Sequence, residues 1–196
     1  MTDSTLKYYR VNAEAFSEAT FDVDFSETED RFLNLLPPEA AILDLGCGAG
    51  RDSLYFLRRG FRVTATDGSP EMCRIASGNT GLQVRTLLFE NLDYENEFDG
   101  IWACASLLHL PPEKLGPVLG KAERALRPRG VMYASFKHGT FSGMRNGRYF
   151  TDFTARSFRE FLAGHSGMII EDSRVSSDVR PGRENEKWLN LLMRKN

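Results

Sequence analysis

Short apolar runs alternate with amphipathic segments along most of the chain. The run from Ala41 to Leu45 is compact and apolar apart from Asp44, which is typical of a central parallel strand buried on both faces. Residues 62–67 alternate in polarity and predict a second strand, and residues 51–59 between the two predict a helix. Strands that alternate with helices predict an α/β fold with a mostly parallel sheet, right-handed crossovers and helices on both faces.

The same alternation continues toward the C-terminus. Further strands are expected at residues 82–89, 97–104, 131–136, 168–175 and 188–193, and further helices at residues 70–77, 112–126 and 154–163. The helix at 70–77 should start after the N-cap Ser69 and stop at Gly78-Asn79. Only a charged loop separates the last two strands, so we expect an antiparallel hairpin at one edge of the sheet.

The first 36 residues form a separate pattern. They are predicted to be helical, amphipathic and rich in aromatic residues for so polar a segment. We interpret residues 1–36 as a helical cap or lid packed on the main domain, which would comprise residues 37–196.

A glycine-rich turn follows the first strand. Gly46, Gly48 and Gly50 stand at alternate positions directly before the helix that begins near Arg51. Glycine lets backbone approach a ligand closely, and a helix start offers unpaired N–H groups, so this turn predicts a nucleotide-type cradle. The dinucleotide fingerprint G-x-G-x-x-G would need a glycine at position 51. Its absence, and the lack of a Tyr-x-x-x-Lys motif, argue against a nicotinamide-dependent oxidoreductase.

A carboxylate ends the second strand about 20 residues after the glycines, where a ribose-binding acid belongs. Asp67 would accept hydrogen bonds from both ribose hydroxyls. The alternative is that Asp67 only stabilises the start of the next helix.

The segment from Leu43 to Arg51, together with Thr66-Asp67-Gly68-Ser69-Pro70-Glu71-Met72, resembles the class I S-adenosylmethionine-dependent methyltransferases. Within them it is most similar to the small bacterial tellurite-resistance-type, or type 11, branch. The resemblance extends from about Tyr8 to the C-terminus. It implies S-adenosylmethionine as cofactor and a Rossmann-like seven-stranded sheet of order 3-2-1-4-5-7-6, in which strand 7 is antiparallel.

Open α/β sheets bind ligands outside the carboxyl ends of their strands. This rule and the resemblance together give a set of candidate cofactor-binding residues: Tyr9, Asp44, Gly46, Cys47, Gly48, Gly50, Arg51, Asp67, Gly68, Met72, Phe89, Glu90, Ala103 and Cys104. Asp44 could instead hold the turn together, Arg51 could be an exposed helix-start residue, and Met72 could be a core residue. The family usually has an acid near the end of the third strand, where this chain has Leu88. We therefore expect packing and the Phe89 backbone to hold the adenine.

Methyl transfer from a sulfonium requires mainly proximity and alignment, and a base is needed only when the nucleophile carries a proton. His109 and His138 are the candidate bases, because they follow the fourth and fifth strands. The alternatives are that His109 packs beneath the site and that His138 is an ordinary loop residue.

Two loops after the later strands are rich in basic residues. We predict that these loops form a basic rim over the cofactor, with Lys137, Arg145, Arg148, Arg180 and Arg183, and that the rim binds an anionic acceptor together with Tyr8. The resemblance also makes Tyr8 or Tyr9 a candidate lid residue. The alternative is that the loop charges are solvated and balanced by neighbouring acids.

The formal net charge of −2 argues against a general nucleic-acid binder, and three widely spaced cysteines suggest free thiols in a reducing compartment. The sequence shows no metal-ligand spacing, no membrane-spanning run and no signal peptide, so we expect a cytoplasmic protein. We expect a methyltransferase acting on a small molecule, as a monomer or weak homodimer. The alternatives are a methyltransferase acting on RNA or another macromolecule, and a non-catalytic cofactor-binding module.

Overall fold

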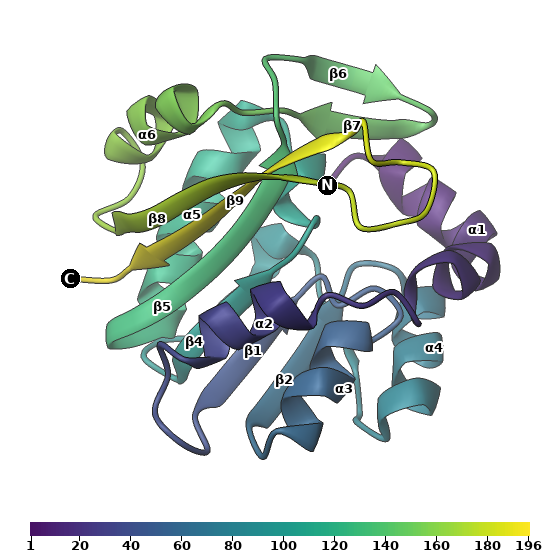
Figure 1. The fold of residues 1–196 in the computed structure, drawn as a ribbon, viewed down its shortest axis with the longest axis horizontal. Coiled ribbons are helices and arrows are strands. Elements are labelled where there is room, and N and C mark those ends of the chain that lie inside the picture. The colour runs from purple at the N-terminus through teal and green to yellow at the C-terminus, as the bar shows by residue number, and fades with distance from the viewer.

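The computed structural model describes residues 1–196 as a three-layer α/β structure (Figure 1). The central sheet has the order β3-β2-β1-β4-β5-β9-β8, and β9 is antiparallel to both of its neighbours. This arrangement confirms the predicted strand order, with β8 and β9 as the sixth and seventh strands. Its strands are β1 (Ala41–Leu45), β2 (Arg62–Asp67), β3 (Arg85–Thr86), β4 (Phe98–Ala103), β5 (Leu126–Lys137), β8 (Ile169–Ser177) and β9 (Lys187–Arg194).

Helices cover both faces of the sheet, as predicted. In Figure 1, α2 and α3 lie in front of the sheet and α5 lies behind it. The α-helices are α1 (Asp3–Thr20), α2 (Ser26–Leu33), α3 (Arg51–Arg58), α4 (Pro70–Thr80), α5 (Pro112–Ala125) and α6 (Ala155–Ala163), with short 3₁₀ turns η1 (Phe89–Asn91) and η2 (Leu107–His109). None of the helices has the length and apolarity that a membrane crossing requires.

The alternation of side chains along the central strands builds two cores. Ile101 and Ala103 of β4 join the large cluster under α5 and α6, whereas Trp102 faces the opposite side. There Trp102 stacks on Tyr133 at a centroid distance of 4.0 Å and packs against Phe32 of α2. Burial on both faces explains why these strands are near-continuous apolar runs.

Three local predictions were wrong. Only residues 85–86 of the expected strand 82–89 pair in the sheet, and Phe89 already begins the turn η1. Helix α4 continues through Gly78-Asn79 and ends at Gly81, which adopts the left-handed conformation of a C-cap. The segment after β5 was expected to be a loop, but it forms the hairpin of β6 (Ser142–Arg145) and β7 (Arg148–Thr151).

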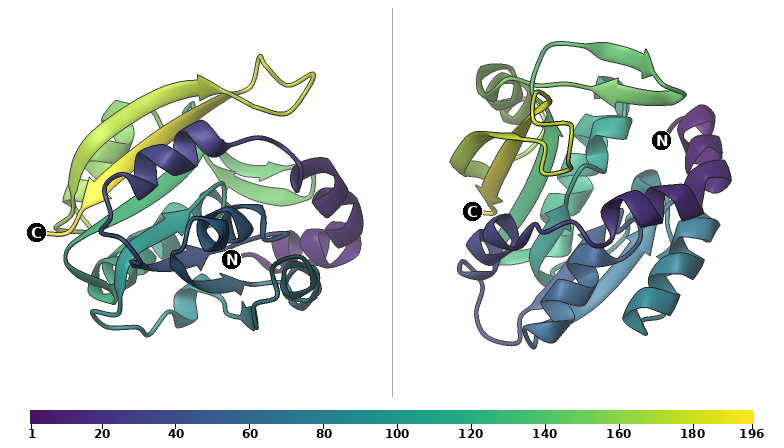
Figure 2. Two further views of the ribbon diagram at one scale, coloured as in Figure 1. Left: turned by 60° about the horizontal axis from the view of Figure 1, so that its bottom comes forward. Right: turned by 45° about the vertical axis from the view of Figure 1, so that its right-hand side comes forward.

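The hairpin and α1 lie side by side over the carboxyl edge of the parallel strands (Figure 2). The backbone N–H of Tyr149 donates to the hydroxyl of Thr5 at 2.9 Å and joins them. Helix α1 also packs against α4. The N-terminal helix and the hairpin therefore form one wall of any binding site at this edge of the sheet.

Candidate active site

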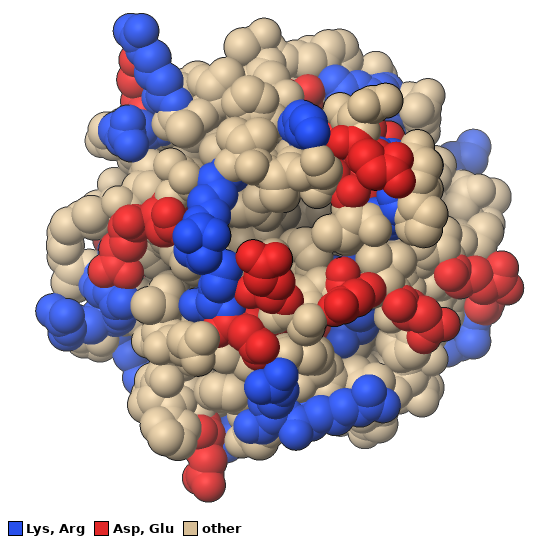
Figure 3. Space-filling model, viewed as in Figure 1, with Lys and Arg blue, Asp and Glu red and all other residues tan.

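A cavity of about 520 Å³ opens at the carboxyl edge, within the range of small-molecule and cofactor sites. Its wall combines the glycine turn, α1, the ends of β4 and β5, the β6–β7 hairpin and the β8–β9 loop. Basic and acidic side chains are interspersed on the face shown in Figure 3 rather than gathered by sign. The fold thus brings these six chain segments to one site.

The glycine turn needs glycine for two different reasons. Gly46 has φ +87°, and a Cβ there would lie 2.5 Å from the Cβ of Ser106. Gly48, with φ +57°, also faces the cavity, so at both positions the backbone is open to a ligand. Gly50 instead meets α4, where a Cβ would lie 2.7 Å from Cγ2 of Thr80. Gly50 therefore serves helix packing.

Asp67 connects β2 to the turn. Its carboxylate accepts the N–H of Gly48 at 3.0 Å and the N–H of Ser69 at 2.8 Å, and it lines the cavity. Burial raises the pKa of Asp67 to about 6. Because the neighbouring glycines have no side chains, a sugar can approach the Asp67 carboxylate, which can accept hydrogen bonds from two hydroxyl groups. These residues therefore fit the nucleoside part of the expected cofactor.

The partly buried Tyr9 and the buried His109 form a hydrogen-bonded pair on the same wall. The Tyr9 hydroxyl lies 2.8 Å from Nε2 of His109, and Nδ1 of His109 lies 2.7 Å from the carbonyl oxygen of Tyr149. A carbonyl oxygen can only accept, so Nδ1 carries the proton and Nε2 accepts from Tyr9. Burial lowers the pKa of His109 to about 4, which keeps the ring neutral.

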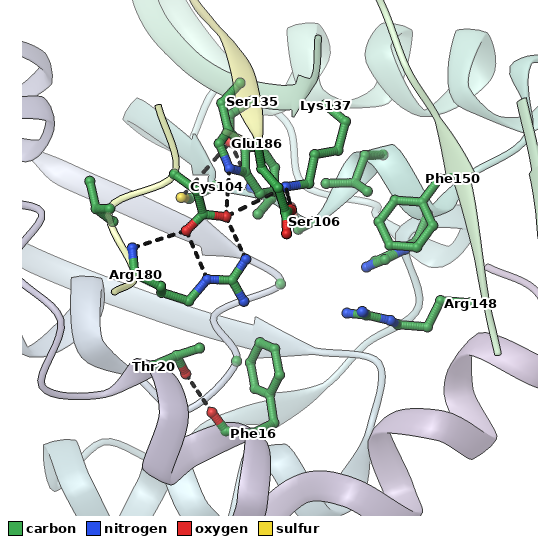
Figure 4. Close-up of a pocket in the computed structure, with 18 of the residues that line it drawn as sticks. Phe16, Thr20, Cys104, Ser106, Ser135, Lys137, Arg148, Phe150, Arg180 and Glu186 are labelled. Atoms are coloured by element: carbon green, nitrogen blue, oxygen red, sulfur yellow. Dashed lines mark hydrogen bonds and ion pairs between the residues drawn. The ribbon is translucent and has the colours of Figure 1, made fainter. Parts of the chain in front are cut away.

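The predicted basic rim does converge on the cavity, but most of its charge is neutralised. Lys137 and Arg180 both pair with Asp178, Arg145 pairs with Asp152 at 2.9 Å, and Arg183 lies 3.4 Å from Glu186. Although burial opposes ionisation, hydrogen bonds from Arg180 hold the pKa of Asp178 well below its usual range. Figure 4 shows Arg180 and Arg148 pointing into the cavity from opposite sides.

Comparison with known proteins agrees with this geometry. Residues 42–130 match a family model described as a methyltransferase domain. A crystal structure of the 1,6-didemethyltoxoflavin-N1-methyltransferase of Burkholderia thailandensis, with S-adenosylhomocysteine bound, has a TM-score of 0.77 and 26% identity, covering 97% of this chain and 85% of that one. The matches support a class I S-adenosylmethionine-dependent methyltransferase. They likewise support S-adenosylmethionine as its cofactor.

Curated methyltransferases are also similar in sequence. The ubiquinone biosynthesis O-methyltransferase of Xanthomonas axonopodis pv. citri is 33% identical over 52% of this chain and 44% of its own length. The corresponding protein of Xylella fastidiosa is 28% identical over 77% of this chain and 67% of its own. This chain spans about half the length of most of the curated relatives that it matches.

Fifteen of the residues predicted for a methyltransferase site line the cavity: Tyr9, Gly46, Cys47, Gly48, Arg51, Asp67, Phe89, Cys104, His109, Lys137, His138, Arg145, Arg148, Arg180 and Arg183. Among them, Arg51 also pairs with Asp52 at 2.6 Å, and its guanidinium lies 4.9 Å from the Phe25 ring centroid. His138 is exposed on the cavity wall.

The other predicted residues lie outside the cavity wall: Tyr8, Asp44, Gly50, Gly68, Met72, Glu90 and Ala103. Asp44 is buried beneath the turn, where it accepts the Ser53 hydroxyl, and burial raises the pKa of Asp44 well above its usual value. Met72 packs between α1 and the turn with Ala13 and Ala49. Glu90 pairs with the N-terminal ammonium group and with Lys114.

Several lining residues were not predicted, among them Phe16, Phe150 and Asp178. Phe16 packs edge-on against Tyr9 with 5.2 Å between ring centroids. The density of aromatic residues in α1 was a usable signal for Phe16. For Phe150, the dipeptide Asn146-Gly147 would have located the hairpin, because Asn-Gly is a strong hairpin signal.

Proposed function

We propose that this protein is a methyltransferase that uses S-adenosylmethionine to methylate a small, anionic acceptor. One observation carries the proposal: a single cavity has the glycine turn and Asp67 on one side and Arg148 on the other. The toxoflavin enzyme and the ubiquinone enzymes are named for small-molecule substrates, which supports a small acceptor here.

On the cofactor side, each role follows from position. Asp67 would accept the ribose hydroxyls, the backbone of Gly46 and Gly48 would face the methionine part, and Arg51 would hold its carboxylate. Phe89, buried on the cavity wall, would pack against the adenine. When bound, the cofactor supplies a methyl group on a sulfonium and leaves as a neutral thioether, so the site needs no acid for the leaving group.

On the acceptor side, the hairpin, α1 and the β8–β9 loop enclose the remaining space. Arg148 and Phe150 face it from β7, and His138 is the exposed candidate base. Because most rim cations are already paired, we expect a small acceptor with little charge rather than a polyanion such as RNA. Assignment to the tellurite-resistance-type branch, cytoplasmic location and a monomeric or weakly dimeric state stay predictions.

The test is formation of S-adenosylhomocysteine from S-adenosylmethionine in the presence of a panel of phenols, ring N–H heterocycles, thiols and oxoanions. The proposal expects turnover with at least one anionic member of this panel and loss of turnover in Asp67→Ala. Cofactor binding without turnover on any member would instead indicate a non-catalytic cofactor-binding module. Turnover on RNA in a separate assay, with none on any member of the panel, would indicate a methyltransferase that acts on a macromolecule.

A further inference from the structure

Arg148 is the only partly buried cation of the cavity wall that lacks a carboxylate partner. Arg51, Lys137, Arg145 and Arg180 each pair with an acid within 4.0 Å, whereas no ion pair involves Arg148. Its Nε is buried and has no hydrogen-bond partner. A guanidinium that is removed from water without a counter-ion favours binding of an anion.

Aromatic rings surround this guanidinium. Its carbon lies 4.4 Å from the Tyr8 ring centroid, 5.1 Å from that of Phe150 and 5.8 Å from that of Tyr9. These contacts hold the guanidinium group in place by cation–π attraction. Figure 4 shows the group directed into the cavity beside Phe150. A flat ligand with a negative edge would meet the guanidinium donors and the rings of Tyr9 and Phe150, which line the cavity.

The charged and titratable groups that face Arg148 do not cancel its charge. Arg145 stands directly opposite on β6, already paired with Asp152. From α1, the Tyr9 hydroxyl accepts from Nη1 of Arg148 at 3.3 Å. From η2, His109 is neutral, because burial lowers its pKa to about 4.

His109 is also not free to take a proton from an acceptor. Its Nδ1–H donates to the Tyr149 carbonyl, and its Nε2 lone pair accepts the Tyr9 hydroxyl. The Tyr9 proton therefore points toward His109, and the Tyr9 oxygen lone pairs point toward Arg148. In this arrangement His109 orients Tyr9, and Tyr9 in turn supports Arg148, so His109 is a positioning residue.

We propose that Arg148 binds the reacting group of the acceptor in its ionised form, and that the acceptor is an aromatic or heteroaromatic ring with an acidic O–H or N–H group. The proton leaves to solvent as the acceptor binds, and the electron pair that remains on oxygen or nitrogen forms the bond to the methyl carbon while the C–S pair stays on sulfur. Ionisation by Arg148 takes the place of a general base, so an acceptor of this kind needs no proton transfer to His138. This inference rests on the proposed function, in which S-adenosylmethionine is the methyl donor.

The test uses 4-nitrophenol as a probe, because its visible absorption reports the ionised form. The probe is titrated against pH with the protein and S-adenosylhomocysteine present, and the pKa of the bound probe is compared with that of the free probe. An opposite charge within about 4–6 Å lowers a pKa by about 1–3 units, so we expect a downward shift of at least about one unit. The neutral analogue 4-nitroanisole should bind at least about tenfold more weakly, since one pKa unit corresponds to a factor of ten.

Matched variants identify the cause of the shift. Arg148→Met should abolish the downward shift, and Arg148→Lys should keep only part of it because lysine lacks the planar fork. Arg145→Met should reduce the shift less, because Asp152 already neutralises Arg145. Arg156→Met removes the same charge from an exposed position on α6 and should leave the shift unchanged.

Three results would overturn the inference: an undiminished shift in Arg148→Met, equal binding of 4-nitroanisole and 4-nitrophenol, or binding of benzoate but not of 4-nitrophenol. Calorimetry with S-adenosylhomocysteine separates this inference from the proposed function. Arg148→Met should bind it as the wild type does, whereas failure of the wild type to bind it would contradict the proposed function itself.

Discussion

Replacement of Gly46 by alanine tests whether the turn after β1 is shaped by contact with Ser106. The new methyl group would lie 2.5 Å from the Ser106 Cβ and 3.3 Å from the Phe89 ring, at a backbone φ of +87°. The left-handed conformation costs a residue with a Cβ about 1–2 kcal/mol. Overpacking in a well-packed region typically adds about 1–3 kcal/mol. We therefore expect Gly46→Ala to destabilise the fold by about 2–5 kcal/mol.

Gly60→Ala is the matched control. Gly60 has nearly the same conformation, φ +85°, but no atom within 4 Å of the position of its Cβ. Gly60→Ala should therefore lose only the free energy that the left-handed conformation costs a residue with a Cβ, about 1–2 kcal/mol. Urea unfolding followed by circular dichroism would give both free energies of unfolding, and their difference isolates the contact with Ser106.

A double variant completes the test. Ser106→Gly removes the Cβ that Gly46→Ala would meet, so the two substitutions should couple favourably in a double-mutant cycle. Equal costs for Gly46→Ala and Gly60→Ala, or strict additivity with Ser106→Gly, would refute the steric account of this turn.

Three further predictions concern the polar residues of the site. Asp67→Asn should weaken S-adenosylhomocysteine binding at least about tenfold in calorimetry, since hydrogen bonds to a charged group contribute about 1.5–3 kcal/mol each, and unchanged affinity would exclude the ribose role. Because the pKa of Asp67 is raised to about 6, the affinity of the wild-type protein for S-adenosylhomocysteine should fall as pH decreases below 6, by up to about tenfold per pH unit. An affinity that does not change with pH would show that binding does not need the ionised carboxylate. The pKa of His109 lies at about 4, below its usual 6.5, so the stability that the neutral ring contributes is full above pH 6.5 and is lost as pH falls toward 4. His109→Gln should therefore reduce the loss of unfolding free energy between pH 6.5 and pH 4 by about 3 kcal/mol. The same pH dependence of stability in the wild type and in His109→Gln would contradict a buried neutral ring.

The strands that form the middle of the sheet were predictable because burial on both faces leaves a simple apolar signature. β1 and β2 have the bounds that the pattern gives, and β4 differs by one residue at each end. β3 pairs through only Arg85 and Thr86, and an edge strand of two residues leaves no periodicity to detect. Helix α4 runs past Gly78, where no atom lies within 4 Å of an added Cβ and nothing forces the helix to stop.

The site was predictable as far as strand ends determine it. Asp67, His109 and the rim cations come directly from the carboxyl edge, and the structure brings them to one cavity. The sequence left open whether neighbouring acids balance the rim charges. The pairing of Lys137 with Asp178 was not predictable, because the two residues are distant in sequence and meet only in the fold. For the same reason, the sequence could not show that Arg148 is the only partly buried cation of the cavity wall without an acidic partner.

Isothermal titration calorimetry of the wild-type protein with S-adenosylmethionine, S-adenosylhomocysteine and nicotinamide dinucleotides tests the central claim most directly. The glycine turn and Asp67 should give both sulfur-containing ligands affinities in the micromolar range, about 8 kcal/mol of binding free energy, and the dinucleotides should not bind. Tight dinucleotide binding without binding of S-adenosylmethionine or S-adenosylhomocysteine would contradict the account.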